Sequence, residues 1–117
     1  MQFEINNRHW VIEETEEKYI IDILQSQEED GVRIIMANGL TDFQKQIIYI
    51  NKDLHEELKK ETLYHELMHC YLRSYTFFPT LERLSEEMLC DLSANSHDII
   101  HKIAEDYFKG GKRCTRK

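Results

Sequence analysis

The second half of the chain holds a long segment with almost no helix-breaking residues. Between residues 54 and 109 there is no glycine, and the single proline, Pro79, stands near the middle. Because proline interrupts a helix and glycine weakens one, this segment predicts two long helices, near residues 54–75 and 82–108. In a chain of 117 residues both helices must belong to one compact unit with a modest core.

The first half of the chain is richer in turn residues and predicts short elements. Residues 2–13 alternate loosely between polar and apolar side chains, which indicates a strand or a hairpin. Residues 15–29 carry apolar side chains at helical spacing and predict a short helix, with a strand as the alternative. Residues 32–36 and 46–50 are β-branched or aromatic runs separated by a polar loop, and they predict two antiparallel strands.

These elements together predict an α+β domain. A small antiparallel sheet from the first half would pack against the two long helices of the second half. We expect the domain to span residues 1–109, because a short basic tail without apolar periodicity begins at Gly110 and Gly111. Residues 110–117 are therefore predicted to be a flexible tail.

Composition narrows the possible partners. The net charge of −7 and pI near 5.3 argue against nucleic acid as the main partner. No apolar run approaches the roughly 18 to 20 residues of a membrane span, and the start of the chain lacks the features of a secretory signal. We therefore expect a cytoplasmic protein without a membrane partner, whose three cysteines, lacking any CxxC pair, are reduced thiols. The oligomeric state is left open.

The residues most informative about chemistry are His65, Glu66 and His69 within the segment LYHELMHCYL. All their neighbours in this segment are apolar or aromatic, and buried imidazoles and carboxylates are costly unless something satisfies them. His65 and His69 are four residues apart and therefore project from one helical face, where they can bind the same metal ion. In this HExxH pattern zinc (Zn2+) takes the two histidines, and Glu66 acts as general base on the zinc-bound water.

A catalytic zinc site needs a third protein ligand, which the second helix should supply. Glu87 lies 18 residues after His69, and Asp91 follows one turn later, where it could accept a hydrogen bond from a zinc-binding histidine. Glu86 ranks second, because it points about 100° away from Glu87 on the same helix. His97 and His101 form another pair spaced by four residues, but they lie further along the helix and are poorer ligands.

The motif and its flanking segments resemble the gluzincin metallopeptidases, and most closely the small ImmA/IrrE-like metallopeptidases of phages and mobile elements. The resemblance covers residues 45–92, from KQIIYIN through TLYHELMHCYL to SEEMLCDL. It implies zinc-dependent hydrolysis of peptide bonds in a minimal zincin-like fold. It also implies the role of each site residue: His65, His69 and Glu87 as metal ligands, Glu66 as the base, and Asp91 as a partner of a ligand.

The resemblance further implies a substrate and a setting. In such proteins an edge strand before the HExxH helix binds an extended protein or peptide substrate, and residues 46–51 would fill this role. The expected target is a regulatory protein in the cytoplasm of a phage-infected host. The alternative is a zinc-containing protein-binding module without proteolytic activity, because 117 residues leave little room for a deep cleft. A proteolytic subunit that needs a second chain to present its substrate is a third reading.

The sequence differs from the motifs of two other HExxH families, the metzincins and the SprT-like proteases. Position 75 is tyrosine, so the extended HExxHxxGxxH motif of the metzincins is absent. The SprT-like proteases usually supply a third histidine, for which His97 would be the candidate. The sequence assigns no residue to stabilisation of the oxyanion, although Tyr71, Tyr75 and His97 are candidates.

Overall fold

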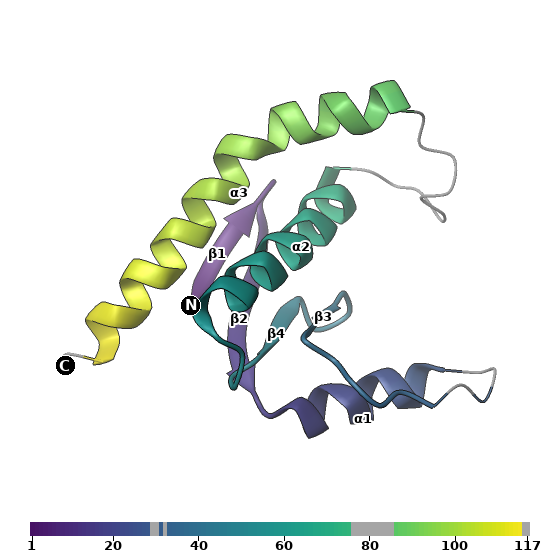
Figure 1. The fold of residues 1–117 in the computed structure, drawn as a ribbon. Helices are drawn as coiled ribbons and strands as arrows, with labels where there is room; N and C mark the ends of the chain where they lie inside the picture. The colour runs from purple at the N-terminus through teal and green to yellow at the C-terminus, as the bar shows by residue number, and fades with distance from the viewer. Residues whose placement is uncertain (29–30, 32, 76–85, 116–117) are drawn as a thin grey trace.

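Over the residues that the structure describes, the fold is built from a four-stranded sheet and three helices (Figure 1). In the computed structural model, the backbone is described for residues 1–28, 31, 33–75 and 86–115, and the side chains for the same residues except 75, 86–95 and 111–115. The elements in chain order are β1 (Gln2–Ile5), β2 (Arg8–Thr15), α1 (Glu17–Gln27), β3 (Gly39–Asp42), β4 (Ile47–Asn51), α2 (Glu56–Tyr75) and α3 (Glu86–Thr115). The predicted α+β class is confirmed.

The sheet is mixed, with the strand order β1-β2-β4-β3. The neighbours β1 and β2 are antiparallel, as are β3 and β4, but β2 and β4 run parallel, in register from Val11 opposite Ile47 to Thr15 opposite Asn51. The prediction of a purely antiparallel sheet is therefore wrong at its central pairing. Parallel neighbours need a crossover connection, and the chain makes it through α1 before the β3–β4 hairpin begins.

The partner of β4 is not the strand that the sequence predicted. Residues 33–36 have irregular backbone, with Ile35 and Met36 strongly exposed, so the strand expected at 32–36 is wrong for the residues that the structure describes. The strand next to β4 is β3, whose sequence GLTD is only four residues long. Gln46 closes the connecting turn with a φ of 58°, and the strand predicted at 46–50 is confirmed as β4 from Ile47.

The three predicted helices are present with shifted ends. The first and second agree with α1 and α2 to within two residues at each end. The third, α3, continues through Gly110 and Gly111 to Thr115, beyond the end predicted near residue 108. Glycine disfavours a helix by only about 1 kcal/mol and does not forbid it. Among the described residues, none of the helices is both long enough and apolar enough to cross a membrane.

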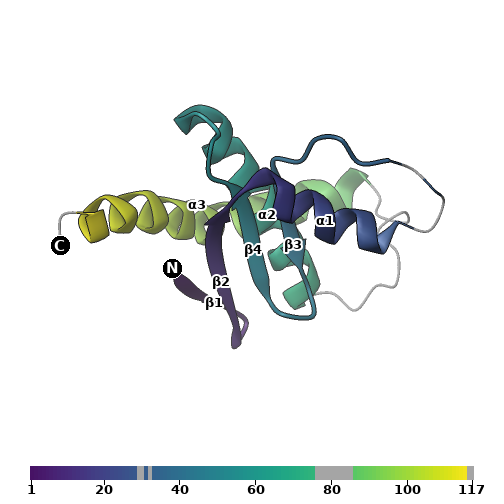
Figure 2. The same ribbon diagram turned by 90° about the horizontal axis from the view of Figure 1, so that it is seen from below.

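Helices cover both faces of the sheet. On one face Ile48 and Ile50 of β4 pack with Leu63 and Leu67 of α2 and with Ile100 of α3. On the other face the buried cluster is smaller and contains Ile20 of α1, Ala37, Leu40 of β3 and Tyr49 of β4. In the view from below, α1 accordingly lies in front of the strands and α3 behind them (Figure 2). Strand β4, with helices over both faces, is the centre of the fold.

Two polar contacts fix the helices against the sheet. Asn6 and Asn7 turn the β1–β2 hairpin with φ values of 49° and 63°, and Asn6 Nδ2 donates to the carbonyl of Ser74 at 2.9 Å, near the end of α2. At the opposite end of β2, Glu14 accepts hydrogen bonds from Lys59 of α2, at 2.7 Å, and from Tyr107 of α3. Burial opposes the ionisation of Glu14, but these two donors outweigh it and lower the pKa of the carboxyl.

Candidate metal centre and substrate groove

The HExxH residues occupy one stretch of α2 and differ in exposure. Leu63, Leu67 and Cys70 are completely buried and hold the inner face of the helix against the core. Because His65 and His69 are two and six residues after Leu63, they lie on another part of the helix surface: His65 is exposed and His69 is half-buried. Glu66 is 7% exposed although it carries a carboxylate. The helix thus holds the two imidazoles at the surface and the carboxylate at the boundary with the core.

The two histidine rings converge. The Nε2 atoms of His65 and His69 lie 3.2 Å apart, and the ring planes meet at 79°. Two nitrogens that each bind a tetrahedral zinc ion at about 2.0 to 2.1 Å are separated by about 3.3 to 3.4 Å, as two corners of the tetrahedron. The observed separation therefore fits a shared metal ion, and these two side chains could hold one together.

Electrostatics at His69 favour the form that binds metal. Burial lowers the pKa of the imidazole, Glu66 opposes this effect, and the neighbouring His65 and Arg73 lower the pKa further. The net shift is downward, so His69 is neutral over a wider pH range than a free histidine. A neutral imidazole has the lone pair that a metal requires.

The third ligand is not tested by the geometry. Glu87 and Asp91 belong to α3, but their side chains lie outside the part of the chain whose side chains are described, as does that of Glu86. Within the described residues, no three His, Cys, Asp or Glu side chains form a group that could hold a metal ion. Glu87 as a ligand and Asp91 as its neighbour in the site stay predictions.

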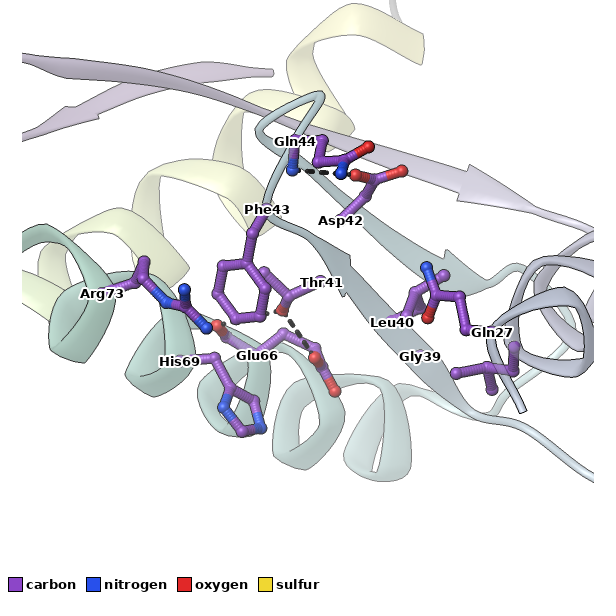
Figure 3. A pocket seen from close by; sticks show the side chains of 11 residues that line it. Gln27, Gly39, Leu40, Thr41, Asp42, Phe43, Gln44, Glu66, His69 and Arg73 are labelled. Atoms are coloured by element: carbon purple, nitrogen blue, oxygen red, sulfur yellow. Dashed lines mark hydrogen bonds between the residues drawn. The ribbon is translucent and has the colours of Figure 1, made fainter. Parts of the chain in front are cut away.

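Glu66 is held by a residue of β3 that sequence reasoning missed. The hydroxyl of Thr41 donates to Glu66 Oε1 at 2.6 Å and lies 3.4 Å from the main-chain carbonyl oxygen of Glu66 (Figure 3). Both residues are buried, so this charge-assisted hydrogen bond is shielded from water. Thr41 thereby fixes the direction of the carboxylate. The two residues are 25 apart in the chain, so no local pattern links them.

A second missed residue, Gly39, lets β3 lie close to α2. A Cβ atom at this position would lie 2.6 Å from Cγ2 of Thr62, 3.1 Å from the carbonyl oxygen of Tyr49 and 3.5 Å from Cγ of Glu66. Only glycine avoids the collision with Thr62. The available signal was a glycine next to an apolar run, which can mark a close approach of two backbones as well as a turn.

Two cavities open beside these residues. The larger, about 740 Å³, lies between α1, β3 and α2 (Figure 3). It is lined by Leu24, Gln27, the six consecutive residues 39–44, Glu66, His69 and Arg73. The smaller, about 330 Å³, includes Asn38, Leu58, Glu61, Thr62 and His65 in its lining. Gly39 and Glu66 line both cavities, so the carboxylate stands where the two meet.

Among the strands that the structure describes, β3, beside the larger cavity, is an edge strand that pairs on one side only, with β4. Asn51 N donates to the carbonyl of Asn38 at 2.8 Å, and the antiparallel register places Gly39 opposite Ile50. Hydrogen-bonded and non-hydrogen-bonded pairs alternate, so the N–H and C=O groups of Gly39 and Thr41 point away from β4. The edge is therefore oriented to pair with an added strand.

The edge role predicted for residues 46–51 is wrong. They form β4 from Ile47, which is paired on both sides, with β2 and with β3. The prediction picked the strand nearest in sequence to the HExxH helix, whereas long-range pairing decides which strand lies at the edge. The strand that can accept a peptide beside the site is β3.

The remaining candidates lie elsewhere. The rings of His97 and His101 stack on α3 with centroids 5.8 Å apart, and His101 Nδ1 is 2.7 Å from the hydroxyl of Tyr64. The described contacts do not join either ring to His65 or His69. Tyr71, a candidate for the oxyanion, is buried in the core, and the side chain of Tyr75 lies outside the described part.

Comparison with known proteins gives one match. The model of a peptidase family, M78, described as the IrrE N-terminal-like domain, matches residues 17–88, which is more than half of the chain. The matched region runs from α1 to the first residues of α3 and includes the HExxH motif, Gly39, Thr41 and Glu87. Neither a curated protein nor a solved structure matches.

Proposed function

The chain belongs to the M78 peptidase family, with an IrrE N-terminal-like domain, and on this premise we propose that it is a zinc-dependent endopeptidase acting at the HExxH helix. The family is one of metallopeptidases, which makes a protein or peptide the substrate. The observation that carries the proposal is the 3.2 Å approach of the His65 and His69 Nε2 atoms beside the buried carboxylate of Glu66.

His65 and His69 would hold the metal, with Glu87 as the third ligand and Asp91 as the partner of a ligand. A bound zinc ion would supply a Lewis acid that polarises the scissile carbonyl and lowers the pKa of a water molecule. The neutral state of His69 that burial favours supports this assignment.

Glu66 would move the proton. Its carboxylate lines both cavities and is oriented by the hydroxyl of Thr41, which leaves a second carboxylate oxygen to accept a proton from the attacking water. The same group would then pass the proton to the leaving amine. Partial burial excludes bulk water and strengthens both steps electrostatically.

Strand β3 would hold the substrate. The outward backbone groups of Gly39 and Thr41 can pair with an extended peptide, which places its backbone along the larger cavity and next to Glu66 and His69. The same strand therefore positions both the base and the substrate. We further propose, from the family resemblance, a phage or mobile-element origin and a regulatory protein of the host cytoplasm as the target.

Metal content and cleavage measured together test the proposal. Elemental mass spectrometry of the protein purified without chelator should give about one zinc per chain in the wild type and in Glu66→Gln, and a loss of zinc in His65→Ala. Glu87→Ala should lose zinc as well, whereas Glu86→Ala, one residue away, serves as the matched control and should keep it. Only the wild type and Glu86→Ala should cleave unfolded casein.

The contrary outcomes are distinct. A wild type without zinc after supplementation would leave His65 and His69 as ordinary surface residues. Cleavage by Glu66→Gln at the wild-type rate would show that Glu66 is not the general base. Zinc without cleavage of any peptide would favour the rival function, a zinc-containing module that binds a protein partner without hydrolysing it.

A further inference from the structure

The larger cavity is lined by a cation–π pair, Phe43 and Arg73, that the proposed mechanism does not use. Phe43 follows β3 directly, and the guanidinium carbon of Arg73 lies 4.2 Å from the centroid of its ring (Figure 3). The same ring meets His69 and Trp10 edge to face, each with centroids 6.3 Å apart. Phe43, which is 36% exposed, thus contacts both rings and the guanidinium of Arg73, which lies one helical turn beyond His69 on α2.

The guanidinium has no acidic partner among the residues whose side chains are described. None of the ion pairs in that part of the chain includes Arg73, although the chain has 22 acidic residues and a net charge of −7. A guanidinium in cation–π contact with a ring keeps N–H groups available for hydrogen bonds. Arg73 is thus a cation in contact with an aromatic ring, and no acidic side chain in the described part of the chain pairs with its guanidinium.

Neither of the two carboxylates that line the larger cavity, Asp42 and Glu66, forms an ion pair with Arg73. Asp42 uses Oδ1 to accept hydrogen bonds from the backbone N–H groups of Gln44 and Lys45, at 3.1 and 3.0 Å. Glu66 accepts from Thr41. Among the residues that line the larger cavity, Arg73 is the one permanently positive side chain.

We propose that Arg73, in cation–π contact with Phe43, is a specificity-determining residue that binds a carboxylate of the peptide substrate. The inference rests on the proposed peptidase function and adds to it the class of substrate. The carboxylate can come from an aspartate or glutamate side chain or from the C-terminus of the peptide. A planar guanidinium binds either source through two parallel hydrogen bonds.

The spacing agrees with a peptide that lies along β3. Arg73 is four positions after His69 on α2, a rise of about 6 Å along the helix. In an extended peptide, residues two apart point to the same side and lie about 6.6 Å apart. A substrate residue facing Arg73 would therefore be two positions from the one facing His69, which predicts the acidic residue at a single subsite.

A binding assay tests the inference without requiring turnover. The probes are two fluorescein-labelled, amidated peptides, Ala-Ala-Glu-Ala-Ala-Ala and the same peptide with glutamine in place of glutamate, added to zinc-supplemented Glu66→Gln protein and followed by fluorescence anisotropy. We expect the glutamate peptide to bind about tenfold more tightly, with a difference that shrinks as salt is raised. In Glu66→Gln/Arg73→Gln the difference should disappear. In Glu66→Gln/Lys102→Gln, which removes an equal charge from the exposed surface of α3, the difference should remain.

A third peptide separates the two carboxylate sources. The glutamine peptide with a free C-terminus should gain affinity over its amidated form only if Arg73 binds the terminal carboxylate. Equal binding of all three peptides, absence of binding, or a preference that survives Arg73→Gln would overturn the proposal. Circular dichroism of each variant shows that the fold is intact.

Mass-spectrometric mapping of the casein cleavage sites separates this inference from the peptidase function. Enrichment of an acidic residue at one subsite in the wild type, lost in Arg73→Gln with cleavage retained, supports both. If the wild type cleaves nothing while the anisotropy difference persists, the peptidase function fails and the carboxylate site stands. If it cleaves with no acidic preference and the peptides bind equally, only the carboxylate site fails.

Discussion

The substitution Gly39→Ala should be costly although alanine suits a strand at least as well as glycine. The added Cβ would lie 2.6 Å from Thr62 Cγ2, where carbon atoms in contact are normally at least 3.4 Å apart. Overpacking of this kind costs about 1 to 3 kcal/mol. Against it stands a gain of about 0.4 to 1 kcal/mol, because alanine has fewer unfolded conformations to lose than glycine. The collision is the larger effect, so we expect a net loss of about 1 to 2 kcal/mol in the free energy of unfolding.

The assay can use the single tryptophan of the chain. Trp10 is 1% exposed, so urea unfolding should change its fluorescence strongly. For a domain of this size the loss corresponds to a fall of about 4 to 8 °C in Tm. The displaced strand would also stretch the 2.6 Å hydrogen bond from Thr41 to Glu66, so cleavage should fall while the zinc content of the α2 histidines is retained.

A second substitution identifies the cause. Thr62→Ser removes the colliding methyl group and keeps the hydroxyl that donates to the carbonyl of Leu58 at 2.8 Å. In the double variant with Gly39→Ala, about half or more of the lost stability should return, and the carbonyl oxygen of Tyr49 at 3.1 Å limits complete recovery. If the losses of stability caused by Gly39→Ala alone and Thr62→Ser alone add up to the loss in the double variant, within about 0.3 kcal/mol, the two sites are not coupled. The collision with Thr62 is then not the reason for glycine at position 39.

Three further predictions concern other parts of the molecule. Thr41→Val should lower the turnover number with little change in zinc content, because the carboxylate of Glu66 loses its orienting donor, and an unchanged turnover number would contradict this role. Glu14→Gln should cost up to about 1 kcal/mol at pH 7. Burial raises the pKa of the Glu14 carboxyl, but the hydrogen bonds from Lys59 and Tyr107 and the charge of Lys59 lower it by more, so the folded pKa is below the ordinary value. The stability that Glu14 contributes is therefore fully present above the unfolded pKa near 4.3, and it is lost as the pH falls through the folded pKa. Urea unfolding at pH 7 and pH 3 measures the change, and an equal difference at both pH values would count against it. Cys70 should resist iodoacetamide in the native protein at pH 8 and react after unfolding, since burial raises its thiol pKa, and rapid native labelling of its peptide would disprove this.

Local features of the site were predictable from the sequence, and long-range ones were not. The facing of His65 and His69 follows from the geometry of one helix, so a spacing of four residues is enough to predict it. The contact between Thr41 and Glu66 depends on the β3–β4 hairpin lying against α2. The periodicity of apolar residues in the sequence does not predict this packing. A strand of four residues with glycine at its start resembles a turn as much as a strand, which is why β3 was missed.

The sheet topology illustrates the same limit. The residues of β2 and of β4 each show a local pattern that predicts a strand. Their parallel pairing, however, joins residues 36 positions apart, as with Val11 and Ile47. Alternation of side chains is identical for parallel and antiparallel neighbours, so it cannot choose between them. The wrong prediction of the edge strand has the same origin as the wrong prediction of an antiparallel sheet. The order of the strands decides which of them is paired on one side only, and the local pattern does not give that order.

An open edge also exposes the protein to its own copies. Unpaired backbone groups at the side of a sheet are templates for any extended chain, which in crowded solution includes partly unfolded molecules of the same sequence. Here the hazard is limited by length, because β3 spans only four residues and points the backbone groups of just two, Gly39 and Thr41, away from the sheet. The charges of Asp42 and Lys45 at its end further oppose growth of a continuous intermolecular sheet. An edge of this size is long enough to seat a short peptide and too short to start an aggregate easily.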